Sequence, residues 1–228
     1  MTSEVTVPEI RSEYVNLSCL YSACVANDLQ EVQTLVNSGA DVYEKVTIVD
    51  KIVGEADKFY TNTPMEIAII RGKDAIVYAM LQGGADPNFR NEANIPMLKL
   101  AVVVNESATV LALLQSGAEP NDGDETICSM LHIAVIRGSV DIVRHLIDFK
   151  IDTSVTDNNG KTALAYGTHI NKLKKNANHT AIVKMLEKEH MSRQKCIAFA
   201  MGHHKRLGIV SLVVEFPPEI LRMVIAAV

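Results

Sequence analysis

Apolar residues recur along the chain at a fixed period, which is the same over most of its length. In five places an apolar residue is followed three positions later by a small one: Leu20/Ala23, Met65/Ala68, Leu98/Ala101, Leu131/Ala134 and Leu164/Gly167. The apolar residues lie 45, 33, 33 and 33 positions apart, so the first interval contains 12 extra residues. A repeat of about 33 residues is typical of a stacked two-helix unit. The pattern predicts an all-α solenoid with an insertion between its first two repeats.

Local signals indicate where the first helix of each unit begins and ends. Thr63 is a suitable N-cap, and Pro64 fits the first turn, where its missing N–H would have no helical partner. Residues that favour the left-handed conformation stand at the equivalent position of four units, namely Asn27, Gly72, Asn105 and Gly138. A second helix is expected after this turn. Its apolar positions, as in Ile142–Ile147, have helical spacing and must be buried against a neighbouring repeat.

The second unit contains the fullest set of recurring residues, which are Thr63-Pro64-Met65, Ala68, Gly72, Ile76-Val77 and Gly84-Ala85-Asp86. In these residues the chain resembles the ankyrin-repeat family, and the other units hold the same register. The resemblance implies stacked helix-turn-helix repeats joined by hairpin loops, and a function in protein binding. It also implies that His132 bridges backbone groups of neighbouring hairpins, and that Asn88 and Asn121 are candidates for hydroxylation.

The period and the resemblance together predict the organisation of the chain. We expect an N-terminal lead-in at 1–14, repeats over 15–189, and C-terminal capping helices or a further motif at 190–228. The five repeats are expected at about 15–42, 61–88, 91–121, 126–153 and 157–189, with the insertion at 43–60.

The first helices of an ankyrin-like stack line a concave groove, and the residues two and three places after each small residue face that groove. The candidate partner-binding residues at these places are Val25, Ile70, Arg71, Val103, Val104, Ile136, Arg137 and His169, with Ala26 and Ile170 completing the pairs. Most of them are aliphatic, and contiguous exposed apolar surface usually marks an interaction site. The alternative is that the C-terminal segment or tight stacking covers this stripe.

The insertion is a second candidate surface. Alternating apolar and polar residues from Val46 to Lys51 predict a long hairpin or a short strand pair. Loops on a rigid scaffold often carry recognition, so its apolar residues are candidate partner contacts: Ile48, Ile52, Phe59 and Tyr60. A loop that packs only on itself is the alternative.

Charge is distributed unevenly along the chain. Residues 1–160 contain 23 acidic and 11 basic side chains, whereas 161–228 contain 4 acidic and 11 basic, within a total net charge of −5. One interpretation is a basic partner attracted to the acidic repeats, and the other is that both regions are ordinary solvated surfaces. The basic residues near the C-terminus have almost no aromatic residues among them, which argues against nucleic-acid binding.

Composition and motifs exclude several other classes of function. No apolar run approaches the length of a membrane span or a signal peptide, so we expect a cytoplasmic protein. The nucleus, or the interior of a host cell, is the alternative location. The four cysteines lack metal-binding spacing and are expected to be small buried side chains. Gly160-Lys161-Thr162 resembles the end of a phosphate-binding loop, but Val155 replaces the glycine required before it. We therefore expect no catalytic site, no cofactor and no metal.

The C-terminal segment departs from the repeat pattern. Residues 212–225 resemble the first helix of an F-box, with candidate contacts at Phe216, Pro217, Ile220, Leu221 and Val224. Poxvirus-type ankyrin proteins end in a shortened element of this kind, which implies recruitment of a cullin-type ubiquitin ligase through its small adaptor subunit. A proline-started amphipathic helix that caps the solenoid explains the same residues.

The sequence thus favours a non-enzymatic protein-interaction module that binds through the concave groove and the hairpin tips. One alternative is a substrate adaptor for a cullin-type ligase. A second is an ankyrin inhibitor that masks a transcription factor, for which the acidic repeats would suit a basic localisation segment. A solenoid fold alone does not decide among them.

Overall fold

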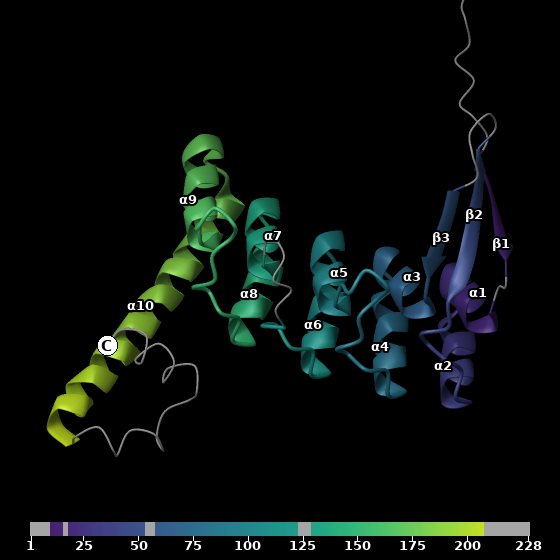
Figure 1. Ribbon diagram of the computed structural model, residues 1–228, viewed down its shortest axis with the longest axis horizontal. Helices are drawn as coiled ribbons and strands as arrows, with labels where there is room; N and C mark the ends of the chain where they lie inside the picture. Colours follow the sequence, from purple (N-terminus) through teal and green to yellow (C-terminus); the bar gives the residue numbers. More distant parts are fainter. Residues whose placement is uncertain (1–9, 16–17, 53–57, 123–128, 208–228) are drawn as a thin grey trace, which may run out of the picture.

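The computed structural model describes residues 10–15, 18–52, 58–122 and 129–207, and these form a row of helix pairs with a small sheet at the N-terminal end (Figure 1). The first helix of each pair is α1 (Cys19–Ala26), α3 (Pro64–Ile70), α5 (Met97–Val104), α7 (Met130–Arg137) or α9 (Ala163–Lys174). The second is α2 (Leu29–Asn37), α4 (Asp74–Gln82), α6 (Ser107–Gln115), α8 (Val140–Asp148) or α10 (Ala177–Leu207). The strands are β1 (Ile10–Val15), β2 (Val46–Ile52) and β3 (Lys58–Asn62).

The helices pack in two parallel rows. Each first helix contacts the first helix of the next pair, so that α1, α3, α5, α7 and α9 form an inner row. The second helices α2, α4, α6, α8 and α10 form an outer row in the same way, and each pair packs together internally. Figure 1 shows the inner row above the outer row, with the chain passing from one to the other in every repeat. The expected all-α repeat solenoid is confirmed.

The turn between the two helices of a pair follows the left-handed residues of the sequence. Asn27, Gly72, Asn105 and Gly138 have φ angles of 60°, 61°, 71° and 76°. This conformation lets the N–H of the residue that caps the outer helix reach back to the inner helix, as where Ser139 N donates to the carbonyl of Ala134 at 3.0 Å. The periodic alanines therefore supply a carbonyl to the turn, while their small side chains are buried between neighbouring inner helices.

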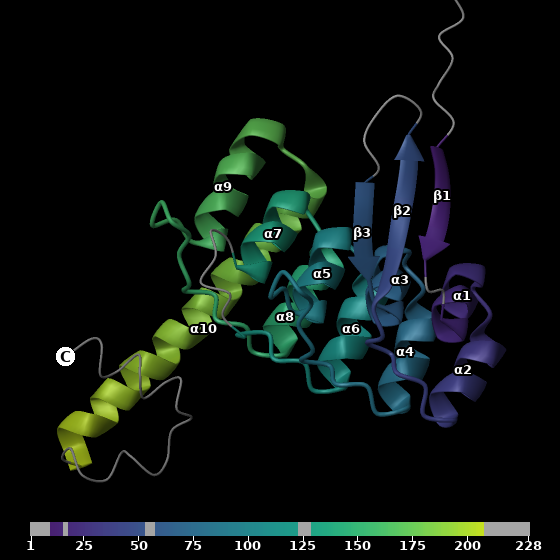
Figure 2. The same ribbon diagram turned by 45° about the vertical axis from the view of Figure 1, so that its right-hand side comes forward.

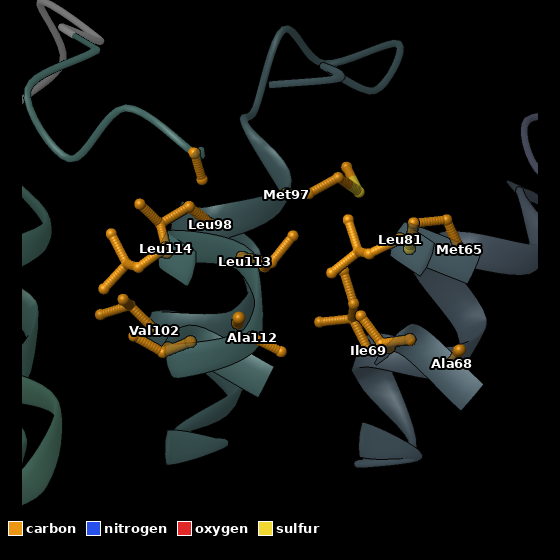
Figure 3. Close-up of a cluster of buried hydrophobic side chains, with 14 of the residues drawn as sticks. Met65, Ala68, Ile69, Leu81, Met97, Leu98, Val102, Ala112, Leu113 and Leu114 are labelled. Atoms are coloured by element: carbon orange, nitrogen blue, oxygen red, sulfur yellow. The ribbon is translucent and has the colours of Figure 1, made fainter. Parts of the chain in front are cut away.

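Side chains from adjacent repeats fill the core between them. Figure 3 shows Met97 and Leu113 extending toward the preceding repeat, where Ile69 is buried. Between α2 and α4 the packing leaves no room for a side chain at Gly83, because a Cβ there would clash with Cγ1 of Val36. No repeat buries its apolar face alone, so the stack is stabilised by contacts between neighbours.

The insertion forms a hairpin that becomes part of a three-stranded antiparallel sheet. Strands β2 and β3 pair with each other, and β1 pairs with the other edge of β2. Figures 1 and 2 show the strands extending away from the helices on the side of the inner row. A hairpin was one of the two forms expected for 43–60, but the strand in the lead-in was not expected. Its alternating pattern, with Ile10 and Tyr14 among polar residues, is too short to stand out.

The fifth helix pair differs from the others. Helix α9 has 12 residues whereas α7 has 8, and its left-handed cap is Lys175 with a φ of 43°. The buried residues of α10 consequently follow those of α8 by 40 positions, as Leu186 follows Leu146. Helix α10 then continues to Leu207 without a break at 189, where the sequence analysis placed the end of the repeats.

Beyond that expected boundary, α10 is anchored to the fourth repeat. The guanidinium of Arg193 donates to the carbonyl of Ile151 at 2.7 Å and to the carboxylate of Asp152 at 3.1 Å. Arg193 also pairs with Glu189 one turn earlier at 3.2 Å. The helix that closes the stack is thus an extension of the fifth repeat.

Candidate protein-binding surface

Polar bridges between neighbouring hairpins hold the repeats in register and so fix the spacing of the inner row. His132 is fully buried, its Nδ1 lies 2.7 Å from the Ser129 hydroxyl, and its Nε2 lies 2.9 Å from the carbonyl oxygen of Lys161. A carbonyl can only accept, so Nε2 carries a proton, and in a neutral imidazole Nδ1 then accepts from the Ser129 hydroxyl. His132 thus contacts the backbone of the next hairpin, as expected, but its second partner is the side-chain hydroxyl of Ser129 and not a backbone group.

The turn that contains Lys161 is organised by a single carboxylate. Asp157 accepts hydrogen bonds from the Tyr166 hydroxyl at 2.6 Å, from the Lys161 N–H at 2.8 Å and from the Asn159 N–H at 2.9 Å. These donors hold the pKa of Asp157 below its usual range. Gly160 has a φ of 70° within the same turn. The Gly-Lys-Thr sequence is therefore a hairpin turn, as the missing glycine suggested.

Two asparagines connect successive hairpins. The side chain of Asn88 donates to the carbonyl of Gly117 at 3.2 Å and accepts from the N–H of Glu119 at 2.9 Å. Asn121 repeats this arrangement, donating to the carbonyl of Lys150 at 3.0 Å. Both amides are engaged in contacts between repeats, so their first role in this molecule is structural.

The inner row exposes an aliphatic residue at the same position of three successive helices. Ile70 of α3 is 42% exposed, Val103 of α5 is 38% exposed and Ile136 of α7 is 45% exposed. Arg71 and Arg137 follow two of them and are exposed, and neither makes an ion pair with any residue that the structure describes. We call the residues Ile70, Arg71, Val103, Val104, Ile136 and Arg137 the inner stripe.

The other residues expected on this surface extend the inner stripe at both ends. Val25 of α1 is half-buried and Ala26 is exposed, while His169 of α9 is exposed and Ile170 is half-buried. Val104, between the two arginines, is half-buried. The described helices therefore leave the whole set of expected positions at least partly accessible.

Among the side chains that the structure describes, Leu29 of α2, Tyr78 of α4 and Met191 of α10 are the large apolar residues exposed on the outer row, and they do not recur at one position of successive repeats. Tyr78 of α4 is 51% exposed, but the residues at its position in the first, third and fourth repeats are Gln33, Leu111 and Arg144. A single exposed apolar side chain is ordinary on a protein surface, whereas a repeated one is not.

The four candidate residues of the insertion lie at different places in the sheet. Ile48 pairs with Tyr60 across β2 and β3, Val49 pairs with Phe59, and Ile52 pairs with Ile10 of β1. The base of the insertion is fixed to the second repeat by Tyr43, whose ring stacks on Phe89 with centroids 4.0 Å apart.

The candidate ligase contacts and the cysteines can be compared with the structure only where their residues are described. Phe216, Pro217, Ile220, Leu221 and Val224 lie outside the described residues. Of the cysteines that are described, Cys24 is buried, and burial raises its pKa to about 12. Cys19 is exposed, which contradicts the expectation that all four are buried, because it lies on the open side of the first turn of α1.

Sequence reasoning missed the residue that joins the second and third repeats. Glu66 is almost fully buried and completes a capping box with Thr63, its carboxylate accepting from the Thr63 N–H at 2.8 Å. It also accepts from the side chain of Asn91 at 3.0 Å, in the next hairpin. The Thr-x-x-Glu spacing could have revealed the capping box, but nothing in the sequence points to Asn91.

These features define an α-helical repeat solenoid whose neighbouring units are connected by polar bridges. Residues 98–195 match the family model described as ankyrin repeats, in three copies. This part of the chain, from α5 into α10, therefore consists of ankyrin repeats. No match is found among the curated proteins. Ankyrin repeats in general are protein–protein interaction modules and are typically non-enzymatic.

The structure adds two observations about other classes of site. No helix within the described ranges is long and apolar enough to cross a membrane. Among the same residues, no group of three His, Cys, Asp or Glu side chains is arranged to hold a metal ion.

Proposed function

We propose that this chain is a non-enzymatic binding module that holds a partner protein along the inner stripe and the adjacent hairpins. The observation that carries the proposal is the exposure of Ile70, Val103 and Ile136 at one position of three consecutive inner helices. An aliphatic residue at a solvent-facing position does not help the stack bury its core. Its repetition is explained by a partner that covers the row.

The sheet supports the same proposal by its position. It extends past the inner row at the N-terminal end of the stack (Figure 2), and Tyr43, just before β2, stacks on Phe89 of the loop between α4 and α5. A partner lying along the inner stripe would meet this sheet at the end of the row. Ile48, Ile52, Phe59 and Tyr60 remain candidate contacts for that reason.

Site-specific photocrosslinking tests the proposal. A benzophenone amino acid replaces Val103 or Ile136 in the inner row, or Tyr78 as a matched exposed position in the outer row. In extract from the source cells, we expect a discrete crosslinked adduct from both inner positions and none from the position of Tyr78. Equal adducts at all three positions, or none at Val103 and Ile136, would contradict the proposal.

A cullin-ligase substrate adaptor is a second candidate, and the sequence of residues 212–225 alone favours it. Calorimetric titration of the purified ligase adaptor subunit into the full chain tests it, with Ile220→Asp and Leu221→Asp as the matched full-length variant. Micromolar or tighter binding that the variant loses would support this function. If the adaptor subunit did not bind the unmodified chain, the ligase-adaptor function would be excluded.

The inhibitor that masks a basic localisation segment gains no support from the charges of the inner helices. That interpretation rested on the acidic balance of residues 1–160. On the inner helices the exposed charged side chains are cationic, as described below.

A further inference from the structure

The acidic and basic residues of the repeats are divided between the two rows of helices. In the inner helices of the first four repeats the only carboxylate is Glu66, which is almost fully buried in its capping box. The charged groups that remain accessible on these helices and their caps are Arg71, Lys99 and Arg137. Helix α9 continues the trend with Lys172 and Lys174.

The outer helices of the same four repeats have the opposite balance. Their acidic residues are Glu31, Asp74, Asp141 and Asp148, against one arginine, Arg144. Arg144 is already paired with Asp141 at 2.9 Å. The four outer helices thus have a net charge of −3, from four carboxylates and one arginine, and the rest of the net negative charge of residues 1–160 lies outside the helices.

One carboxylate approaches the inner stripe from a turn. Glu106, the first residue after the cap of α5, packs so closely against Gly72 that a Cβ there would lie 2.8 Å from its Oε1. It is half-buried and forms no ion pair with Arg71, the residue before Gly72. Arg71 and Arg137 therefore remain available to a partner.

The spacing of the inner stripe favours a helix as the bound element. Neighbouring packed helices lie roughly 8–10 Å apart. A helix laid across them rises about 1.5 Å per residue, so each step corresponds to roughly five to seven residues, and at the upper end of this range it comes close to two full turns. One face of such a helix could meet Ile70, Val103 and Ile136 in succession. In an extended strand, side chains on one face recur every two residues, which is ~6.6 Å, or every four residues, which is ~13 Å. Neither distance matches the spacing between neighbouring inner helices.

From these observations we infer that the occupant of the inner stripe is an acidic amphipathic helix of a partner protein. Its apolar residues recur about every seventh position and contact Ile70, Val103 and Ile136. Asp or Glu residues on one flank, roughly 11–14 positions apart, pair with Arg71 and Arg137. The inference deepens the proposed function and rests on it.

A selection from displayed peptides tests the inference. Each peptide in the library is a helix of three heptads with leucine fixed at every seventh position. Each position that flanks a leucine is varied, with Glu, Lys, Gln and Ala at equal frequency. The full chain is the target, and selected peptides are measured by fluorescence anisotropy. We expect Glu to exceed Lys at the flanking positions, and Arg71→Glu with Arg137→Glu to weaken binding about tenfold or more at low salt.

Two control variants locate the effect. Arg144→Glu changes an exposed arginine of the outer row and is expected to leave peptide affinity unchanged. Ile136→Ser removes an apolar contact of the inner stripe and is expected to weaken every selected peptide. Because both residues are exposed, both variants should remain folded, which circular dichroism checks.

The outcomes separate this inference from the proposed function. The selected peptides could bind Ile136→Ser more weakly than wild type and yet contain as much Lys as Glu at the flanking positions. This result would support the proposed function and contradict the inference of an acidic helix. Peptides that bind equally well to Ile136→Ser would contradict both. If Leu221→Asp with Val224→Asp in the full chain raised peptide affinity about tenfold, the C-terminal segment would compete for the inner stripe and would be its occupant in the unbound chain, which would overturn the assignment of the stripe to a partner protein alone.

Discussion

Helices α7 and α8 belong to one repeat and pack against each other, yet they present different side chains to solvent. Helix α7 exposes Ile136 and Arg137, while α8 exposes Asp141, Arg144 and Asp148. In the second and third repeats the inner helices likewise expose Ile70 and Val103, but α4 exposes Tyr78 beside Asp74, and α6 contains no charged residue.

The contrast shows which part of each helix serves stability. Both helices bury an apolar face, with Val135 of α7 and Leu146 of α8 fully inaccessible. Burial of about 25 cal/mol per Å² of apolar surface stabilises the stack through those faces. The parts of Ile70, Val103 and Ile136 that remain exposed make no such contribution, so a partner protein can account for the apolar residues at these positions.

The largest expected effect compares a buried leucine with the exposed isoleucine of the same repeat. Leu146→Ala is expected to lower the free energy of unfolding by about 2–5 kcal/mol, because it leaves a cavity between α8 and its neighbours. Ile136→Ala is expected to change it by less than about 0.5 kcal/mol. Urea denaturation of the full chain, followed by far-UV circular dichroism, measures both. A loss of several kcal/mol for Ile136→Ala would mean that the inner stripe is part of the core.

A smaller loss is expected when the bridge between the fourth and fifth repeats is removed. His132→Ala leaves the carbonyl of Lys161 and the hydroxyl of Ser129 without their buried partner, and should cost about 2 kcal/mol. His145→Ala, on the partly exposed face of α8, is the matched control and should cost less than about 0.5 kcal/mol. Equal losses from the two variants would show that the bridge does not stabilise the stack.

Much of this architecture could be predicted from the sequence because the repeat imposes the same local conditions many times. Asn27, Gly72, Asn105 and Gly138 occupy left-handed positions that few other residues tolerate, so their spacing predicted the turns correctly. The Thr63-Pro64 pair likewise predicted the start of α3. The exposure of Ile70, Val103 and Ile136 followed from the register, although their binding role remains a prediction.

Features that depend on distant residues could not be predicted in this way. Strand β1 pairs with β2 across more than thirty residues, and its own sequence is too short to identify it. The contact of Glu66 with Asn91 depends on the path of the following hairpin. The division of charge between the two rows became visible only when each residue was assigned to a helix, since the chain order suggested a division between the two ends.

The carboxylate of Asp157 gives a pH-dependent test of the hairpin bridges. Its hydrogen bonds favour the charged form, so the folded-state pKa lies below the unfolded value of about 4. The stabilisation is therefore complete above that pH and is lost as the pH falls through the folded-state pKa. Asp157→Asn should lower the melting temperature at neutral pH, by less than His132→Ala does.

The difference between wild type and Asp157→Asn should then narrow as the pH falls below about 4, because the protonated carboxyl resembles the amide. Melting curves by circular dichroism across this range measure the difference. A constant difference down to the lowest pH at which the chain still folds would mean that the turn does not depend on the charge of Asp157.

The smallest expected effect on stability separates the two exposed arginines of the fourth repeat. Arg144 pairs with Asp141 on the solvated surface of α8, and such pairs contribute about 0–1 kcal/mol. Arg137 has no ionic partner among the described residues. Arg144→Ala and Arg137→Ala should therefore both leave the free energy of unfolding within about 0.5 kcal/mol of wild type. Only Arg137→Ala should weaken binding of the selected acidic peptides, and more strongly at low salt than at high salt, because salt screens exposed charges. The two variants remove the same type of side chain from two helices of one repeat. If both weakened peptide binding equally, the peptide would contact the outer row as well as the inner row, and binding would not be specific to the inner stripe.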